Sequence, residues 1–360
     1  MDRVLSRFDN WLRDDGPAAL VVREYLVPVE GPDGVLFPPT FAAGDGFPGG
    51  YNIDVFPNGE SVCLVDSVGS QANRIEPLFA KEQYAGLVPR IVIKAGDKTV
   101  SLLEAGHRAG DAIVRCTALQ SDLRRAFQAV LKGNAEPLAK IAPTSIVFGA
   151  WDSRDTQAKL PRLIASTIRA YNVRKLTRSA QYVPAADYVA GELLPEPADK
   201  AAKDAYAERG FIHVPASGSH GGIIADNQIR RDAALHLACL RLLAGEADPL
   251  ALHRYILGLA LTAFTYPVGG YLRQGCHLVP DGEKPRELKE VYGDGRRVDA
   301  TLTHAEALTY AKATAKEFGV GPDQEVEFDK GLAQKDVSGE QTGGGRRPKK
   351  GVKSKGPEPK

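Results

Sequence analysis

Basic side chains cluster in residues 151–181, and their types and spacing suggest binding of phosphate. This stretch holds seven Lys or Arg and two Asp, a local excess of +5 in a chain whose net charge is +1. Such a cluster favours an extended anionic partner. A solvated surface face is the alternative interpretation. The polar residues assigned to this surface are Lys159, Arg162, Ser166, Arg169, Arg174, Lys175 and Arg178.

A helix is the element that we expect to position these cations. Leu160, Leu163, Ile164, Ile168 and Tyr171 recur at spacings of three, four and seven, the pattern of a helix that buries one apolar stripe. The basic residues recur at a matching spacing on another face. They would form a cationic stripe roughly 15 Å long, at about 1.5 Å rise per residue.

A second polar group lies where a strand is predicted to meet a helix. Residues 61–68 favour a strand, and Ser70 can cap the helix that follows. Backbone N–H groups at a helix N-terminus favour phosphate. The alternative is a capping network in which Arg74 pairs with Glu76 or Asp66. The group consists of Ser67, Ser70, Gln71, Asn73 and Arg74.

Common catalytic and metal-binding patterns are absent from the sequence. The four cysteines include no CxxC pair, and the seven histidines include no HxxxH or HExxH. His220 lies in SGSHGG, but no GxSxG elbow accompanies it. Three aspartates, Asp66, Asp152 and Asp155, lie near the end of a predicted strand or in the loop after it. All three are equally suited to cap a helix or to pair with Arg74 and Arg154.

Composition places the chain among globular proteins. It has 360 residues, 43% hydrophobic and 25% charged. The N-terminus lacks signal-peptide features, and the longest apolar run, 250–265, is short and contains charge, so we expect a cytoplasmic protein with no membrane partner. Residues 341–360 carry a net +6 and the preceding residues −5. We expect 331–360 to be a disordered basic tail that either contacts phosphates or only solubilises the chain.

The order of predicted elements favours an α+β fold over a doubly wound parallel sheet. Strands and helices alternate irregularly, which is compatible with the β-α-β-β-α-β core of RRM and ferredoxin-like folds. Two Gly- and Pro-rich segments, 31–59 and 182–227, are expected insertions. Strands are predicted over 18–29, 61–68, 87–94, 99–103, 144–148 and 271–279, and helices over 119–131, 228–243, 250–264 and 304–318.

Three segments together resemble one family. They are DSVGSQANRIE at 66–76, FGAWDSRDTQAKLPRLIASTIRAYNV at 148–173 and LGLALTAFTYPVGGYLRQGCHLV at 257–279. They are similar to the backbone subunit, a RAMP-superfamily protein, of the type I-G (formerly I-U) CRISPR Cascade effector complex. The resemblance runs over 1–330 and leaves the tail outside.

The resemblance implies a modified RRM-like palm with inserted finger and thumb segments, for which 31–59 and 182–227 are both thumb candidates. Copies of such subunits polymerise head to tail along one CRISPR RNA, grip its spacer phosphates and leave bases free to pair with target DNA. The implied partners are CRISPR RNA, further copies of the chain, a large subunit and a guide-end capping subunit. Cutting is left to a recruited helicase-nuclease, so no catalytic residue, metal or cofactor is expected.

The resemblance also implies RNA contacts for the two polar groups. Phosphate contacts suit a guide whose sequence varies, because Lys and Arg bind phosphate irrespective of base. Arg273, displayed from 271–279, joins them. Related backbone subunits of type III systems cleave target RNA with a loop aspartate, a role for which Asp66, Asp152 and Asp155 are candidates. Two alternatives therefore stay open: a metal-dependent ribonuclease using Asp66 or Asp152, and a DNA-binding scaffold that relies on the tail. The expected RNA-binding residues are Ser67, Ser70, Gln71, Asn73, Arg74, Lys159, Arg162, Ser166, Arg169, Lys175, Arg178 and Arg273.

Overall fold

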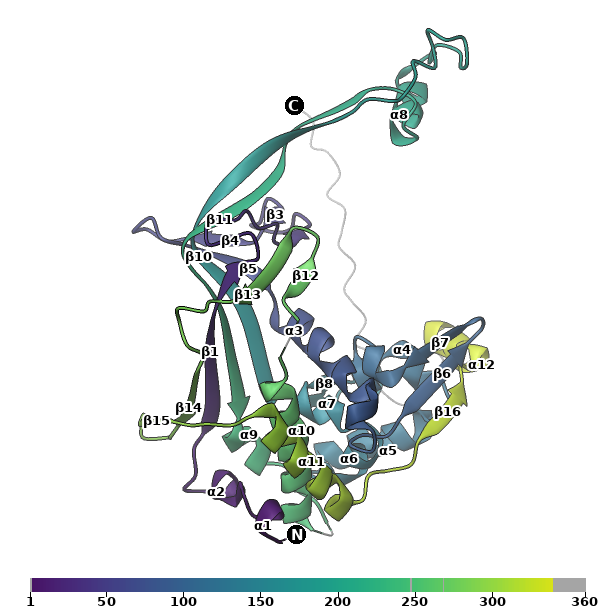
Figure 1. Ribbon diagram of the computed structural model, residues 1–360. Helices are drawn as coiled ribbons and strands as arrows, with labels where there is room; N and C mark the ends of the chain where they lie inside the picture. Colours follow the sequence, from purple (N-terminus) through teal and green to yellow (C-terminus); the bar gives the residue numbers. More distant parts are fainter. Residues whose placement is uncertain (1, 247, 268, 339–360) are drawn as a thin grey trace, which may run out of the picture.

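The computed structural model describes residues 2–246, 248–267 and 269–338 and has a mixed α+β fold (Figure 1). Its largest element is an antiparallel sheet with the order β12-β13-β1-β11-β10-β5-β4, in which β14 also pairs with β1 and with β15. The strands are β1 (Ala19–Pro28), β4 (Ile53–Val55), β5 (Ser61–Asp66), β10 (Ile164–Tyr182), β11 (Val214–His236), β12 (Tyr271–Arg273), β13 (Cys276–Pro280), β14 (Glu287–Val291) and β15 (Arg297–Asp299).

Strand β10 replaces the helix predicted over 151–181, so that prediction was wrong. Ile164, Ser166, Ile168 and Ala170 are all buried, which is the two-residue period of a strand. Ser166 is polar and hides this alternation in the sequence. Pairing with β11, formed over most of the strand's length, decides the conformation.

The helix predicted over 228–243 is also wrong for most of its length. Those residues continue β11 to His236, and only α9 (Leu237–Arg241) is helical. Ile229, Ala233 and Leu235 are buried at alternate positions, and Arg231 between them is buried because it pairs with Glu24 at 2.7 Å. A charged residue on the buried face made the strand pattern unreadable from the sequence.

Helices cover one side of the sheet (Figure 1). The predicted helices 250–264 and 304–318 are confirmed as α10 and α11, and 119–131 is confirmed as α5. A Cβ on Gly258 would lie 2.9 Å from the Ala311 Cα, so glycine permits the close crossing of α10 and α11. The main helices are α3 (Val68–Ile75), α5 (Gln120–Leu131), α7 (Thr144–Val147), α10 (Pro249–Thr265) and α11 (His304–Phe318).

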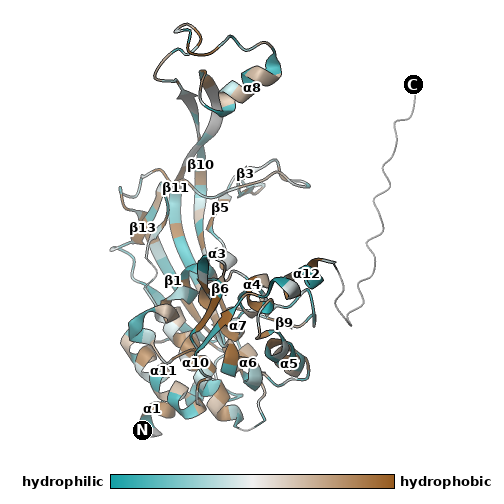
Figure 2. Ribbon diagram, turned by 90° about the vertical axis from the view of Figure 1, so that its right-hand side faces the viewer, coloured by the Kyte–Doolittle hydropathy of each residue, from teal (hydrophilic) through white to brown (hydrophobic). Residues whose placement is uncertain are grey.

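Residues 144–148 form α7 followed by Phe148 and not the predicted strand. A short apolar run fits either state, and here all four α7 residues are buried within the helical layer. Figure 2 shows hydrophobic residues gathered there, around α6, α7 and β6. The other short helices are α1 (Asp2–Leu5), α2 (Asp9–Leu12), α4 (Ala112–Arg115) and α6 (Glu136–Ile141).

A separate three-stranded sheet has the order β16-β6-β7. The turn predicted at Gly96-Asp97 joins β6 (Ile91–Ala95) to β7 (Lys98–Ser101), and β16 (Gln324–Glu327) adds in parallel. The chain continues into α12 (Lys330–Ser338), where Asp336 pairs with Arg115. Residues 331–338 of the expected disordered tail are therefore helical, and 339–360 lie outside the described residues.

The β10–β11 hairpin projects from the body as a long arm with α8 (Lys200–Glu208) at its far end (Figure 1). Segment 182–227 is thus the distal part of this arm, with 214–227 in β11. Segment 31–59 holds the short strands β2 (Thr40–Phe41) and β3 (Gly50–Tyr51) and braces the arm, because the Tyr51 hydroxyl accepts the Gly222 N–H at 2.9 Å. Within the described chain, no helix has the length and hydropathy to cross a membrane.

Candidate nucleic-acid interface

The predicted strand-to-helix group converges on one buried carboxylate, Asp66 at the end of β5. Its Oδ1 accepts hydrogen bonds from Ser70 Oγ (2.7 Å) and Arg273 Nη2 (3.2 Å). Its Oδ2 accepts from Gln71 Nε2 (2.6 Å) and Arg74 Nε (3.2 Å). The carboxylate is fully buried and has four donors. Such saturation satisfies a buried charge and leaves it little capacity for a metal.

Hydrogen bonds within the protein occupy the uncharged polar side chains of this group. Ser67, not the predicted Ser70, caps α3: its side chain accepts the Ser70 N–H at 3.2 Å. The Ser70 hydroxyl instead bonds Asp66. Gln71 Oε1 accepts the Ser166 hydroxyl at 2.9 Å, which ties α3 to β10. Gln71 and Ser166 are buried, so the structure gives them no surface for a ligand.

The two arginines that bond Asp66, Arg74 of the group and Arg273 of β12, also donate to backbone carbonyls of neighbouring strands. Arg74 Nη2 donates to the Leu272 carbonyl at 2.7 Å, and Arg273 Nη1 donates to the Val65 carbonyl at 3.0 Å. Their side chains are 30% and 26% exposed. Each therefore keeps an accessible edge for phosphate, although its charge is shared with Asp66.

Asn73 points to a residue that the sequence analysis missed, Arg108. Arg108 Nη2 donates to Asn73 Oδ1 at 3.3 Å, and Nη1 donates to the Gly149 carbonyl at 3.2 Å. Glu76 pairs with Arg108 at 2.7 Å, so of the two partners expected for Arg74 in a capping network, Asp66 is confirmed and Glu76 is wrong. Burial raises the pKa of Glu76 to about 7, against the opposing effect of the Arg108 charge.

Lys159 and Arg162 lie at a cavity of about 330 Å³ beside this ion pair. Strands β8 (Ala150–Trp151) and β9 (Lys159–Leu160) pair Trp151 with Lys159, whose Nζ is 5.8 Å from the indole centroid. Among the described residues, neither Lys159 nor Arg162 forms an ion pair. The cavity is lined mainly by Gly106, His107, Arg108, Trp151, Lys159 and Arg162.

The other predicted cations lie apart from this cavity, so the single cationic stripe was wrong. Arg169 points to the sheet face opposite Ser166, in register with Arg230 of β11. Farther out, Arg174 pairs with Asp226 at 2.8 Å. Lys175 is exposed on the arm, and Arg178 lies 5.7 Å from the Phe37 ring.

That opposite face carries a cationic and aromatic group which sequence reasoning also missed. Arg230 donates to the Tyr171 hydroxyl at 3.0 Å, and its guanidinium lies 4.8 Å from that ring. Arg23 and Arg230 share Asp232 as an ionic partner. The sequence predicts a helix over 228–243, which contains Arg230. The register of β11 against β10 is what brings Arg230 beside Tyr171.

Two loop aspartates have local partners. Asp152 is buried in the β8–β9 loop, where its Oδ2 accepts both the N–H (2.8 Å) and the hydroxyl (2.7 Å) of Thr156. Asp155 pairs with Arg124 at 3.4 Å, while burial raises its pKa. No cluster of three or more potential metal ligands occurs among the described residues.

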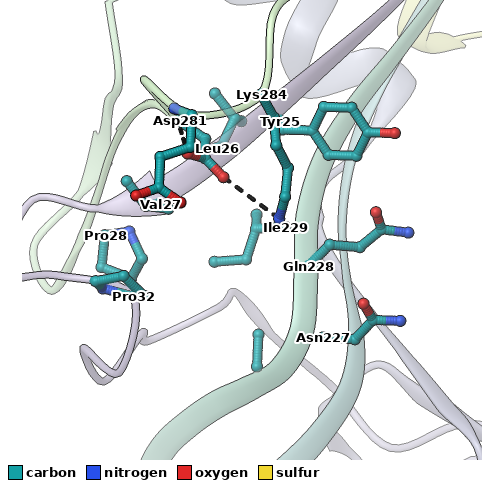
Figure 3. A pocket seen from close by; sticks show the side chains of 12 residues that line it. Tyr25, Leu26, Val27, Pro28, Pro32, Asn227, Gln228, Ile229, Asp281 and Lys284 are labelled. Atoms are coloured by element: carbon teal, nitrogen blue, oxygen red, sulfur yellow. Dashed lines mark hydrogen bonds and ion pairs between the residues drawn. The ribbon is translucent and has the colours of Figure 1, made fainter.

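Another cavity, of about 290 Å³, lies between β1, β11 and residues 281–284 (Figure 3). Lys284 bonds the Asp281 carboxylate there at 3.4 Å and lies over the Tyr25 ring. Glu283 also lines this cavity. Its balance of charge is acidic, which makes it a poorer site for phosphate than the cavity at Arg162.

The comparison with protein families gives one match. Residues 20–175 match the model described as CRISPR-associated protein GSU0053 (Cas_GSU0053), which indicates a CRISPR-associated protein. The matched segment contains Asp66 and the strand-to-helix group that follows it, the residues that line the cavity at Arg162 and the first part of β10, whereas Arg178 and Arg273 lie beyond it. No curated protein matches the chain.

Proposed function

We propose that this CRISPR-associated chain is a non-catalytic backbone subunit that binds CRISPR RNA in a type I effector complex. Several copies would lie along one guide and present its bases to target DNA in antiviral defence. The observation that carries the proposal is the cavity beside Trp151, where Lys159 and Arg162 have no carboxylate partner among the described residues. Two unneutralised cations beside an exposed indole are suited to an RNA backbone.

Sequence-blind contacts meet the requirement of a guide carrier. Each spacer differs, so the protein must hold phosphates and leave the pairing edges of most bases accessible. Arg162 approaches the first turn of α3, since its Nη2 lies 4.0 Å from the position of a Cβ on Gly69. The exposed edges of Arg74 and Arg273 would extend this phosphate path.

The arm suits contact with a neighbouring copy. At about 3.3 Å per residue, the 19 residues of β10 span roughly 60 Å. Tyr182 and Val183, where β10 ends, and Leu193 beyond are 51%, 67% and 65% exposed. We assign the thumb to this arm. The large subunit, the guide-end capping subunit and the helicase-nuclease are proposed partners of the assembled complex.

The contacts of Asp66 and Asp152 support the non-catalytic part of the proposal. A metal-dependent nuclease needs carboxylate oxygens free to bind the ion. Asp66 uses both oxygens on four protein donors. Asp152 Oδ1 accepts no hydrogen bond, but the residue is buried in the β8–β9 loop, away from solvent.

Sedimentation of the purified protein, freed of nucleic acid, with a guide-length RNA tests the proposal. We expect several protomers per RNA, with RNA left intact in Mg²⁺. Replacing residues 184–212 by a short glycine turn should leave single-site binding but lower the number of protomers bound at a given concentration. A complex limited to one protomer would contradict the backbone role. Mg²⁺-dependent cleavage that Asp152→Ala abolishes would favour the ribonuclease instead.

A further inference from the structure

The cavity beside Trp151 combines an aromatic side chain from one segment with basic side chains from two others. Trp151 is 56% exposed although its backbone is paired in the β8–β9 ladder. Lys159 is its cross-strand partner, so both side chains lie on the same face of the ladder. Arg162 enters two residues after β9, and His107 and Arg108 come from the segment before α4.

The charge of this cavity is positive because two of its basic side chains, Lys159 and Arg162, have no carboxylate partner among the described residues. Arg108 is 4% exposed and pairs with Glu76 beneath the cavity. His107 lies 3.4 Å from Asp111. Burial lowers the pKa of Arg108, the Glu76 charge opposes this, and the nearby charge of Arg162 lowers the pKa further. Arg162 and Lys159 thus supply two positive charges at the mouth.

The aliphatic stem of Arg162 lies close to the backbone of Gly149. A Cβ on Gly149 would lie 2.8 Å from Arg162 Cγ, and Gly149 has φ +78°. Glycine therefore allows the Arg162 stem to lie against the chain, and the guanidinium reaches toward Gly69 of α3. A cation that lines the same cavity as the indole and reaches toward the first turn of α3 suits a phosphate that follows a stacked base.

We propose that this cavity holds one nucleotide of the bound RNA: its base stacks on Trp151, and Arg162 and Lys159 bind the flanking phosphates. The inference rests on the proposed function and deepens it by naming a base-stacking site within a phosphate path. Every base offers a π face, so stacking adds affinity without sequence preference. The volume, about 330 Å³, lies at the lower end of the range for small-ligand sites.

Tryptophan fluorescence tests this proposal, because the chain has only two tryptophans and Trp11 is 4% exposed. A uridine-rich RNA of guide length should quench the emission of the wild-type protein. An abasic ribose-phosphate oligomer of the same length should bind through phosphates with little quenching. Trp151→Phe leaves Trp11 as the sole reporter and should show no quenching by RNA.

Affinities measured by anisotropy complete the test. Trp151→Ala should weaken RNA binding roughly tenfold and leave abasic-oligomer binding unchanged, whereas Trp151→Phe should retain most of the RNA affinity. Thermal melting checks that both variants are folded. Wild-type RNA binding without quenching, or unchanged affinity in Trp151→Ala, would overturn the stacking site but leave the proposed function intact. Absence of any RNA binding at low salt would overturn both.

Discussion

The Asp66 cluster and the Trp151 cavity use the same residue types for opposite purposes. Around Asp66, two arginines and two uncharged donors surround a buried carboxylate and tie α3, β5 and β12 together. Beside Trp151, Lys159 and Arg162 lie at a surface cavity with no acidic partner among the described residues. An arginine binds a phosphate strongly only where no carboxylate of the protein already pairs with its guanidinium.

The largest effect is expected from removing the buried carboxylate. Asp66→Ala leaves Arg74 and Arg273 without their shared partner and should lower the free energy of unfolding by about 3–5 kcal/mol. Urea denaturation measures this loss. Asp226→Ala is the matched control: it breaks an exposed pair with Arg174 and should cost less than about 1 kcal/mol. Equal losses would show that the Asp66 cluster is not structural.

The Glu76–Arg108 pair lies between the two regions and should make stability depend on pH. Burial raises the pKa of Glu76 from 4.5 to about 7, so between these values the folded state keeps a proton that the unfolded state releases. Stability should therefore fall as pH rises through this window, by up to about 3 kcal/mol. Glu76→Gln should flatten this slope in urea titrations, and an unchanged slope would refute the assignment.

Binding should respond to the cavity and not to the cluster. Arg162→Ala should weaken RNA binding by roughly 1 kcal/mol and reduce the log–log salt slope by about one. Its stability in urea should stay close to that of the wild type. Arg297→Ala removes an exposed cation at β15, on another part of the molecule, and provides the charge-matched control. Equal losses of affinity in both variants would indicate only a net-charge effect.

The smallest effect is expected on the arm. Lys175 is exposed, so salt should screen any contact of its ammonium group with phosphate. Lys175→Ala should therefore weaken RNA binding about twofold at low salt and have no effect at high salt. Anisotropy at two salt concentrations measures this difference. A loss larger than that of Arg162→Ala would place the main phosphate contacts on the arm.

Local sequence patterns correctly predicted those helices and strands whose start, end and buried face are set by residues of the element itself. Helix α11 has a capping box of Thr303 and Glu306 at its start and Gly319 in the left-handed region at its end. Strand β10 could not be predicted in this way, because Ser166 is polar yet buried and its partner Gln71 lies 95 residues away. Long-range pairing here overrides local periodicity.

The sequence predicted which residues of the candidate site come together, but not that most of them bond a buried carboxylate. Ser70, Gln71, Arg74 and Arg273 do come together, yet around a carboxylate that consumes most of their hydrogen-bonding capacity. Arg108 was missed because nothing in its own segment indicates that Glu76 and Gly149 surround it. Which cations stay unpaired depends on such distant contacts.

The most direct measurement is the affinity of the nucleic-acid-free protein for two unrelated guide-length RNAs over a salt series. The proposed role predicts similar affinities for both sequences and a log–log salt slope of several units, because phosphate contacts dominate. A strong preference for one sequence, or binding insensitive to salt, would contradict a guide carrier that holds RNA by its backbone.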